Sequence, residues 1–173
     1  MQELLEILKI LIPAGAVFAA TYFIVKSFLD NDNKKRELEF RKSSLAIVTP
    51  IRLQAYERII IFLERLHPNN LVLRITKVGM TSQQLHAELI KTVKNEYEHN
   101  ISQQIYVSVG AWELVKTAKE ETIKVINISS TKVPELAKGQ DLAAIILQLS
   151  SSIDKMPSQV ALEYLKREIG QSF

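Results

Sequence analysis

Two segments of this sequence combine glutamate and histidine at a spacing that can bind a metal. Glu64 and His67 form one Glu-x-x-His pair, and Glu96 and His99 form another, each within a stretch of helical periodicity. On a helix, residues three apart lie on one face, one turn from each other. Di-iron four-helix bundles use two such pairs, together with one glutamate from each of two other helices. The pattern therefore raises the hypothesis of a metal-dependent enzyme that uses these two pairs.

The neighbours of the two pairs argue against this hypothesis. His67 precedes Pro68, and a residue before proline is disfavoured from helical geometry. Glu64 is next to Arg65 on the polar face of its segment, whereas di-metal ligands must point into the core. We therefore expect solvated or capping roles for these side chains. We predict no metal ligand, no cofactor and no catalytic residue.

Other patterns that carry chemistry are missing or isolated. The chain has no cysteine, which excludes disulfides, thiolate metal sites and a cysteine nucleophile. Its five glycines are too far apart to form a phosphate-binding loop. His86 stands alone, and the three serines at 150–152 have no base beside them in the sequence. The sequence thus favours a protein without catalysis of its own.

The charges of the chain are nearly balanced. Its 173 residues include 22 basic and 19 acidic side chains, which gives a net charge of +3. The isoelectric point is about 9.0. A nucleic-acid-binding protein concentrates lysine and arginine on one face, and the sequence shows no such stripe. We therefore predict no nucleic-acid partner.

The most apolar segment lies near the N-terminus. Sixteen uncharged residues separate Lys9 from Lys26, and apolar neighbours extend the segment from Leu4 to Leu29. About 20 residues are needed to cross a bilayer, and lysine stems are long enough to reach its interfaces. The start of the chain is acidic at Glu3, unlike a cleaved signal peptide. We therefore predict a membrane anchor over residues 1–29.

Basic residues predict the orientation of this anchor. The N-terminal side offers only Lys9 and the terminal amine. The other side offers six basic residues, namely Lys26, Lys34, Lys35, Arg36, Arg41 and Lys42. Because the cytoplasmic flank of a membrane helix carries the excess of lysine and arginine, we expect a single pass. The N-terminus would lie outside and the C-terminal domain in the cytoplasm.

Two features allow self-association. Gly15 and Ala19 are four residues apart, a spacing at which small side chains let two membrane helices pack closely. Residues 30–49 form a charged juxtamembrane helix or stalk, whose thin apolar seam is made by Leu38, Leu45 and Val48. This segment is a short coiled coil or merely a stalk. A homo-oligomer and an unknown protein partner both remain open.

Helical patterns fill the remainder, residues 50–173. Thr49 and Pro50 suit the N-cap and the first position of a new helix, which we predict to extend to about Leu66. Residues 71–75 are compatible with a helix or an extended segment. We favour a short helix, because no second strand is available and an isolated strand leaves its backbone groups unpaired.

Capping residues mark the later helices. The predicted boundaries are a capping box at Thr81 and Gln84, a cap at Ser108 for a helix to about Ser129, a loop at 133–139, an amphipathic helix from Leu142 to Ile153, and a last helix that begins at Met156 and Pro157 and stops at Gly170. We therefore predict an all-α fold in which a single N-terminal transmembrane helix precedes a bundle of about five helices.

A polar cluster in the middle of the chain is the predicted contact region for a partner. It places acidic, histidine and amide side chains next to aromatic residues, which have an apolar body and a polar tip. Its members are Glu98, His99, Asn100, Gln103, Gln104, Tyr106 and Trp112. The alternative is that these residues satisfy backbone groups at a buried turn between two helices.

Several stretches resemble an uncharacterised family of small bacterial proteins, each with one N-terminal membrane helix and a helical cytoplasmic domain. They are residues 52–58, 62–65, 79–81 and 96–108, together with Ala111 and Trp112. The most specific stretch is EYEHNISQQIYVS at residues 96–108. The resemblance covers most of the chain from Leu4 onward. It implies an architecture and a bacterial inner membrane, but no catalytic residues.

The sequence therefore favours a membrane-anchored helical scaffold or protein-interaction module without catalysis. One alternative is the metal-dependent enzyme that uses Glu64 with His67 and Glu96 with His99. The other is a structural, self-assembling stalk protein.

Overall fold

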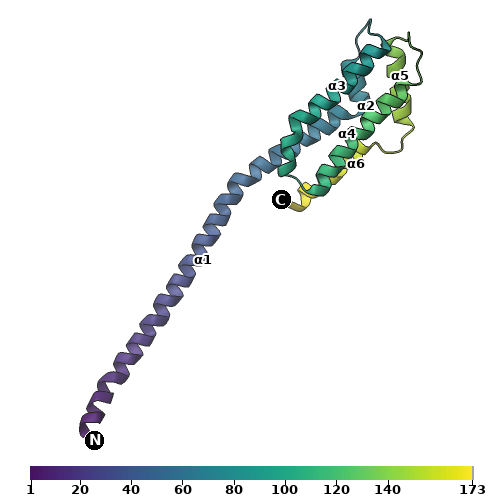
Figure 1. The fold of residues 1–173 in the computed structure, drawn as a ribbon. Helices are drawn as coiled ribbons and strands as arrows, with labels where there is room; N and C mark the ends of the chain where they lie inside the picture. The colour runs from purple at the N-terminus through teal and green to yellow at the C-terminus, as the bar shows by residue number, and fades with distance from the viewer. Residues whose placement is uncertain (173) are drawn as a thin grey trace. The chain divides into compact units, whose positions relative to one another are not determined.

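A computed structural model of the chain describes residues 1–172, and the side chains of residues 3–8, 10 and 172 fall outside that description. The side chain of Leu4, at the start of the predicted anchor, is one of these. Every regular element within the described residues is helical (Figure 1). The elements are α1 (Gln2–Leu66), α2 (Pro68–Ile75), α3 (Ser82–Asn100), the 3-10 helix η1 (Ile101–Ile105), α4 (Val109–Ser130), α5 (Gly139–Ser151) and α6 (Pro157–Ser172). The predicted all-α fold is confirmed.

Helix α1 continues past the point at which we predicted a new helix. Thr49 and Pro50 lie inside it, so the separate helix predicted from Pro50 is wrong. A proline inside a helix costs about 3 kcal/mol or more, because one backbone hydrogen bond is lost and its ring meets the preceding turn. The carbonyl that loses its partner belongs to Ala46, which is exposed, so water can satisfy it. The local capping pattern does not show whether the preceding turns are helical.

The chain divides into two compact units, Met1–Thr49 and Pro50–Phe173. The finer division into 1–29, 30–49 and 50–173 remains a prediction. In the first unit, exposed i,i+4 ion pairs join Arg36 Nε to Asp32 Oδ2 at 2.9 Å and Arg41 Nη2 to Glu37 Oε1 at 2.8 Å. Such exposed pairs each stabilise a helix by only about 0.3–0.5 kcal/mol.

Apolar side chains of the first unit are exposed along its helix. They include Leu11, Ile12, Val17, Phe18, Tyr22, Phe23, Ile24, Val25, Phe28 and Leu29. Within the described residues, α1 is the one helix long and apolar enough to cross a membrane, judged by length and composition. None of the most apolar 18-residue segment of α1 is buried.

The second unit has a continuous hydrophobic core. Helix α4 packs against α3, α5 and α6, and α3 also packs against α5 and α2. Each helix contributes side chains to one cluster, among them Tyr56, Ile59, Phe62 and Leu63 of α1, Leu71 of α2, Leu85 and Leu89 of α3, Ile126 of α4, Leu142 and Ile146 of α5, and Leu165 of α6. This core fixes the last turns of α1 within the unit.

The predicted caps at Thr81 and Ser108 are confirmed. Thr81 accepts from the Gln84 backbone N–H at 3.2 Å, and the Gln84 side chain accepts from the Thr81 backbone N–H at 3.0 Å. Ser108 Oγ accepts from the Ala111 N–H at 3.1 Å and so begins α4. Residues 71–75 are helical as expected, because they belong to α2.

Two predicted helix ends are wrong, and one element was not predicted. Residues 101–105 form η1, a 3-10 turn that the periodicity did not indicate. The amphipathic helix ends at Ser151 rather than at Ile153, whose side chain is exposed and gains nothing from an added turn. Helix α6 passes through Gly170 to Ser172. Gly170 does not adopt the left-handed conformation of a helix stop. Among the described residues, Gly79 is the only glycine with positive φ.

Gly79 and Gly170 make a matched test of this backbone. Gly79 has φ of +86° and open space where an added Cβ would lie, so Gly79→Ala meets strain but no clash. We expect it to lower the free energy of unfolding by about 1–2 kcal/mol. Gly170→Ala adds a methyl to open space on a helix and should be neutral or slightly stabilising. Urea unfolding of the full-length chain, followed by fluorescence of its single tryptophan, measures both. Equal effects of the two substitutions would contradict the assigned backbone.

Candidate functional site

Glu96 of α3 forms ion pairs with two arginines. Arg65 Nη2 lies 3.0 Å and Arg74 Nη1 lies 3.4 Å from Glu96 Oε1. The carboxylate thereby links α3 to the end of α1 and to α2. To serve as a metal ligand, Glu96 would have to exchange these guanidinium partners for a cation. The observed pairing therefore supports a structural role for this carboxylate.

The histidines of the two Glu-x-x-His pairs lie in different surroundings. His99 Nδ1 is 2.7 Å from the Asn95 carbonyl oxygen. Because a carbonyl oxygen can only accept, Nδ1 carries the proton and Nε2 is left for another partner. His67 sits at the N-cap of α2, and the Glu64 side chain is exposed. Among the side chains that the structure describes, no three His, Asp or Glu gather as metal ligands would. The two Glu-x-x-His pairs are therefore not part of a metal-ligand set among the described side chains.

The predicted contact residues divide by exposure. Trp112 and Gln103 are buried, with 6% and 8% of their surface exposed. Asn100 and Tyr106 are half-buried, whereas Glu98, His99 and Gln104 are exposed. Only the exposed and half-buried members are accessible to a partner on the folded surface. A partner contact through them remains a prediction.

Trp112 is an anchor between helices. Its ring stacks on Tyr97 of α3, with centroids 5.6 Å apart, and Tyr97 lies 6.3 Å from the Phe62 ring of α1. Lys119 Nζ lies 4.4 Å from the centroid of the Tyr97 ring, a cation–π contact. This aromatic stack accounts for Trp112 as a packing residue that holds α1, α3 and α4 together.

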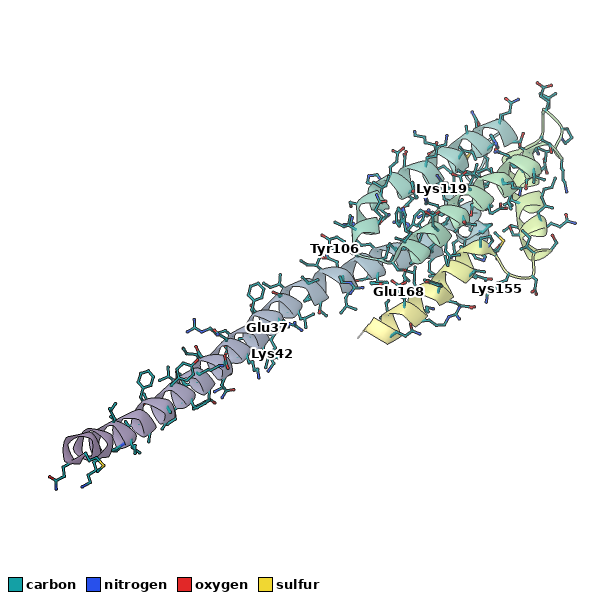
Figure 2. All side chains as sticks on the ribbon, turned by 60° about the horizontal axis from the view of Figure 1, so that its bottom comes forward. Glu37, Lys42, Tyr106, Lys119, Lys155 and Glu168 are labelled. Atoms are coloured by element: carbon teal, nitrogen blue, oxygen red, sulfur yellow. The ribbon has the colours of Figure 1, made fainter. Side chains whose placement is uncertain are left out.

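A carboxylate that the sequence did not single out joins three helices. Tyr56 of α1 donates its hydroxyl to Glu168 Oε1, and Ser108 donates its hydroxyl to Glu168 Oε2. The Ser108 backbone N–H donates to Oε1 at 3.1 Å. Glu168 belongs to α6, so its negative charge sits at the N-terminus of α4, where the helix dipole favours an anion. Glu168 and Tyr106 are labelled in Figure 2.

These contacts change the acidity of both partners. Burial by itself raises the pKa of the Glu168 carboxyl, but hydrogen bonds from Ser108 and Tyr56 and the charge of Arg52 outweigh it, and the pKa lies below its ordinary value. For Tyr56, burial and the hydrogen bond to Glu168 raise the pKa of the phenol. The pair is therefore held as a carboxylate and a neutral phenol across the neutral range.

An open cleft of about 570 Å³ lies beside Glu168. Its walls include Arg52, Tyr106, Tyr164, Arg167 and Glu168. Arg52 donates from Nε to the Tyr106 carbonyl oxygen at 3.2 Å. Both oxygens of Glu168 already accept hydrogen bonds, and the Ser108 hydroxyl is used as a cap. The arrangement therefore stabilises the bundle and offers no activated nucleophile.

A second open cleft of about 540 Å³ lies between the last turns of α1 and helix α3. We call it the α1–α3 groove. Its lining residues are Arg58, Ile61, Phe62, Arg65, Thr92, Asn95, Glu96, His99 and Asn100. The groove brings two of the predicted contact residues, His99 and Asn100, together with arginines that lie more than 30 positions earlier in the sequence. Sequence reasoning missed Arg58 and Arg65, although their seven-residue spacing places them on one helix face.

The Glu168 contacts predict a specific loss of stability in acid. Because the folded pKa of Glu168 lies below the ordinary value of 4.5, the folded state binds fewer protons than the unfolded state in this range. This contribution to stability is present above pH 4.5 and is lost as the pH falls through the folded pKa. Glu168→Gln should cost about 1–2 kcal/mol at neutral pH and flatten this acid dependence.

Glu163→Gln on the same helix is the matched control. The Lys155 ammonium lowers the pKa of Glu163, but this pair is exposed and should contribute little. Urea unfolding between pH 3 and 7, roughly the window in which carboxyl groups titrate, separates the two variants. An acid dependence that survives unchanged in Glu168→Gln would show that other carboxyl groups cause it.

A known protein family matches nearly the whole chain. No curated protein and no solved structure matches the chain. Residues 2–172 match a family described as Family of unknown function (DUF7935). Because the match spans nearly the whole chain, the protein belongs to this family of unknown function.

Proposed function

We propose that this chain is a membrane-anchored helical module that binds another protein and performs no catalysis itself. The observation that carries the proposal is the exposure of apolar side chains along α1 from Leu11 to Leu29, including Phe18 at 75%. Soluble monomers seldom expose so large an apolar surface. At about 1.5 Å per residue, this stretch is roughly 28 Å long, close to the ~30 Å hydrocarbon core of a bilayer.

The basic residues that follow the apolar stretch support one orientation. Lys34, Lys35 and Arg36 come soon after Leu29, whereas Lys9 is the only basic side chain before the stretch. The rule that cytoplasmic flanks are basic then assigns residues 50–173 to the cytoplasm. The resemblance to small bacterial membrane proteins makes the bacterial inner membrane the proposed location.

The continuity of α1 supports the role of a tethered module. The helix that carries the exposed apolar stretch also supplies Tyr56, Ile59 and Leu63 to the core of the second unit. An anchored domain is confined to the membrane surface, which raises its effective concentration toward partners held at the same surface. The absence of an activated nucleophile among the described contacts is in keeping with binding rather than turnover.

Membrane attachment and orientation can be tested together. The chain has no cysteine, so a maleimide can react only with a cysteine that is introduced into it. In bacterial cells we expect the protein to remain in the membrane pellet after alkaline carbonate extraction. An impermeant maleimide should label Gln2→Cys in intact spheroplasts but Ser43→Cys only after lysis. Phe18→Arg combined with Ile24→Arg should release the protein, because each arginine costs about 2.5–3.5 kcal/mol at the helix centre.

Release of the unsubstituted protein by carbonate would show that α1 is covered by something other than lipid. The reverse labelling pattern would keep the anchor but overturn the orientation.

Self-association along the stalk is a second candidate role, and it can coexist with the first. It is favoured by the exposure of Leu38, Leu45 and Val48, which form a seam with heptad-like spacing on the first unit. A second copy of the same helix would cover this seam.

Cysteine crosslinking tests this seam. We expect Leu45→Cys to form a disulfide-linked dimer in native membranes under mild oxidation. Ser43→Cys points to a different face, about 200° around the helix from residue 45, and should not. Equal crosslinking of both variants, or of neither, would contradict pairing through this seam.

A further inference from the structure

The α1–α3 groove has two walls with regular spacing. On α1, Arg58, Ile61 and Arg65 follow each other at i, i+3 and i+7, so they lie along one stripe of the helix. On α3, Thr92, Asn95 and His99 repeat the same spacing. The two arginines are about 10 Å apart along the axis of α1, since seven residues rise by roughly 1.5 Å each. The groove is therefore an elongated cleft with cations at a defined interval.

The charges around the groove are out of balance. Arg65 and Arg74 share one oxygen of Glu96, which is the only carboxylate among the described residues that line the groove. Arg58 is exposed and makes no ion pair within the described residues. Each guanidinium has five donors, and a shared carboxylate oxygen satisfies only part of them. Two arginines and one carboxylate line the groove, and Arg74 draws on that same carboxylate from outside the lining, which leaves positive charge and unused donors at the cleft.

The remaining contacts give the groove an apolar strip and a fixed imidazole. Ile61 lies between the two arginines with 47% of its surface exposed, and it is backed by buried Phe62. The hydrogen bond from His99 Nδ1 to the Asn95 carbonyl holds the ring, so Nε2 is the nitrogen left for a ligand. The groove thus combines cations at its ends, an apolar centre and polar side chains on the opposite wall.

We propose that the α1–α3 groove binds an acidic amphipathic helix of a partner protein. Two carboxylates of that helix, seven residues apart, would pair with Arg58 and Arg65, and an apolar side chain between them would pack on Ile61. A helix supplies this spacing because both sides repeat at the same two-turn interval. The inference rests on the proposed role as an interaction module and names the partner class for it.

The same cations could attract lipid phosphates, but the groove fits a helix better. A single headgroup would pair with one arginine and leave Ile61 uncovered. A continuous helix covers both charges and the apolar strip at once.

Peptide binding to the full-length chain in phosphatidylcholine nanodiscs tests the proposal. The probe is a fluorescent helical peptide with two glutamates seven residues apart and a leucine between them. A second peptide with lysines in place of the glutamates is its control. We expect saturable binding of the acidic peptide alone, weakened by added salt. Arg58→Glu should reduce the affinity about tenfold or more, which corresponds to about 1.4 kcal/mol.

Lys166→Glu provides the matched control variant, since Lys166 is exposed on α6 and does not line the groove. It should bind the acidic peptide as the unsubstituted chain does. Arg58 makes no ion pair among the described residues, so its substitution should leave the unfolding midpoint unchanged and separate binding from folding.

Three results would overturn the proposal. The first is equal binding of both peptides, and the second is an equal loss of affinity for the acidic peptide in Arg58→Glu and Lys166→Glu. The third is binding of phosphatidylglycerol vesicles that depends on Arg58, without binding of the acidic peptide. The last result would assign the groove to lipid headgroups. Because nanodisc binding does not depend on the natural location of the protein, failure here is distinguishable from failure of the carbonate extraction test.

Discussion

Helix α1 has to satisfy two environments with one backbone. Its last turns place Tyr56, Ile59 and Leu63 in a packed core, whereas its earlier turns expose Phe18 and other apolar side chains that no part of the described chain covers. A helix can do this because its backbone hydrogen bonds are internal, so its surroundings need only match the side chains. The core fixes the last turns of the helix, and these turns also line both clefts.

Local signals made much of the fold predictable, and long-range contacts account for the rest. The caps at Thr81 and Ser108 involve residues three apart, so they can be read directly from the sequence. The break expected at Pro50 does not occur, because a pattern typical of a helix start does not show whether the preceding turns are helical too. Glu168 contacts Ser108 and Tyr56 across 60 and 112 positions, and no spacing rule connects them. For the same reason the sequence could not show that Arg58 and Arg65 line the same cleft as His99.

The two acidic centres of the domain differ in how completely they are satisfied. Glu168 receives donors on both oxygens, from a hydroxyl of α1 and from the capping residue of α4. A network satisfied in this way joins helices and specifies their register. The Glu168 oxygens already accept three hydrogen bonds from within the bundle. The cleft beside it is therefore best understood as a consequence of how α1, α4 and α6 meet.

At Glu96 the balance is reversed, since donors outnumber acceptors. Arg65 and Arg74 compete for one oxygen, and Arg58 stands nearby without an ionic partner among the described residues. An exposed guanidinium in water is well solvated, so this excess destabilises the fold little. When a guanidinium contacts a partner's carboxylate, the pair adds affinity and fixes the position of the partner, because the guanidinium donors lie in a fixed plane. In the proposed function, Glu168 holds the helices together, and the groove whose cations are in excess recognises the partner.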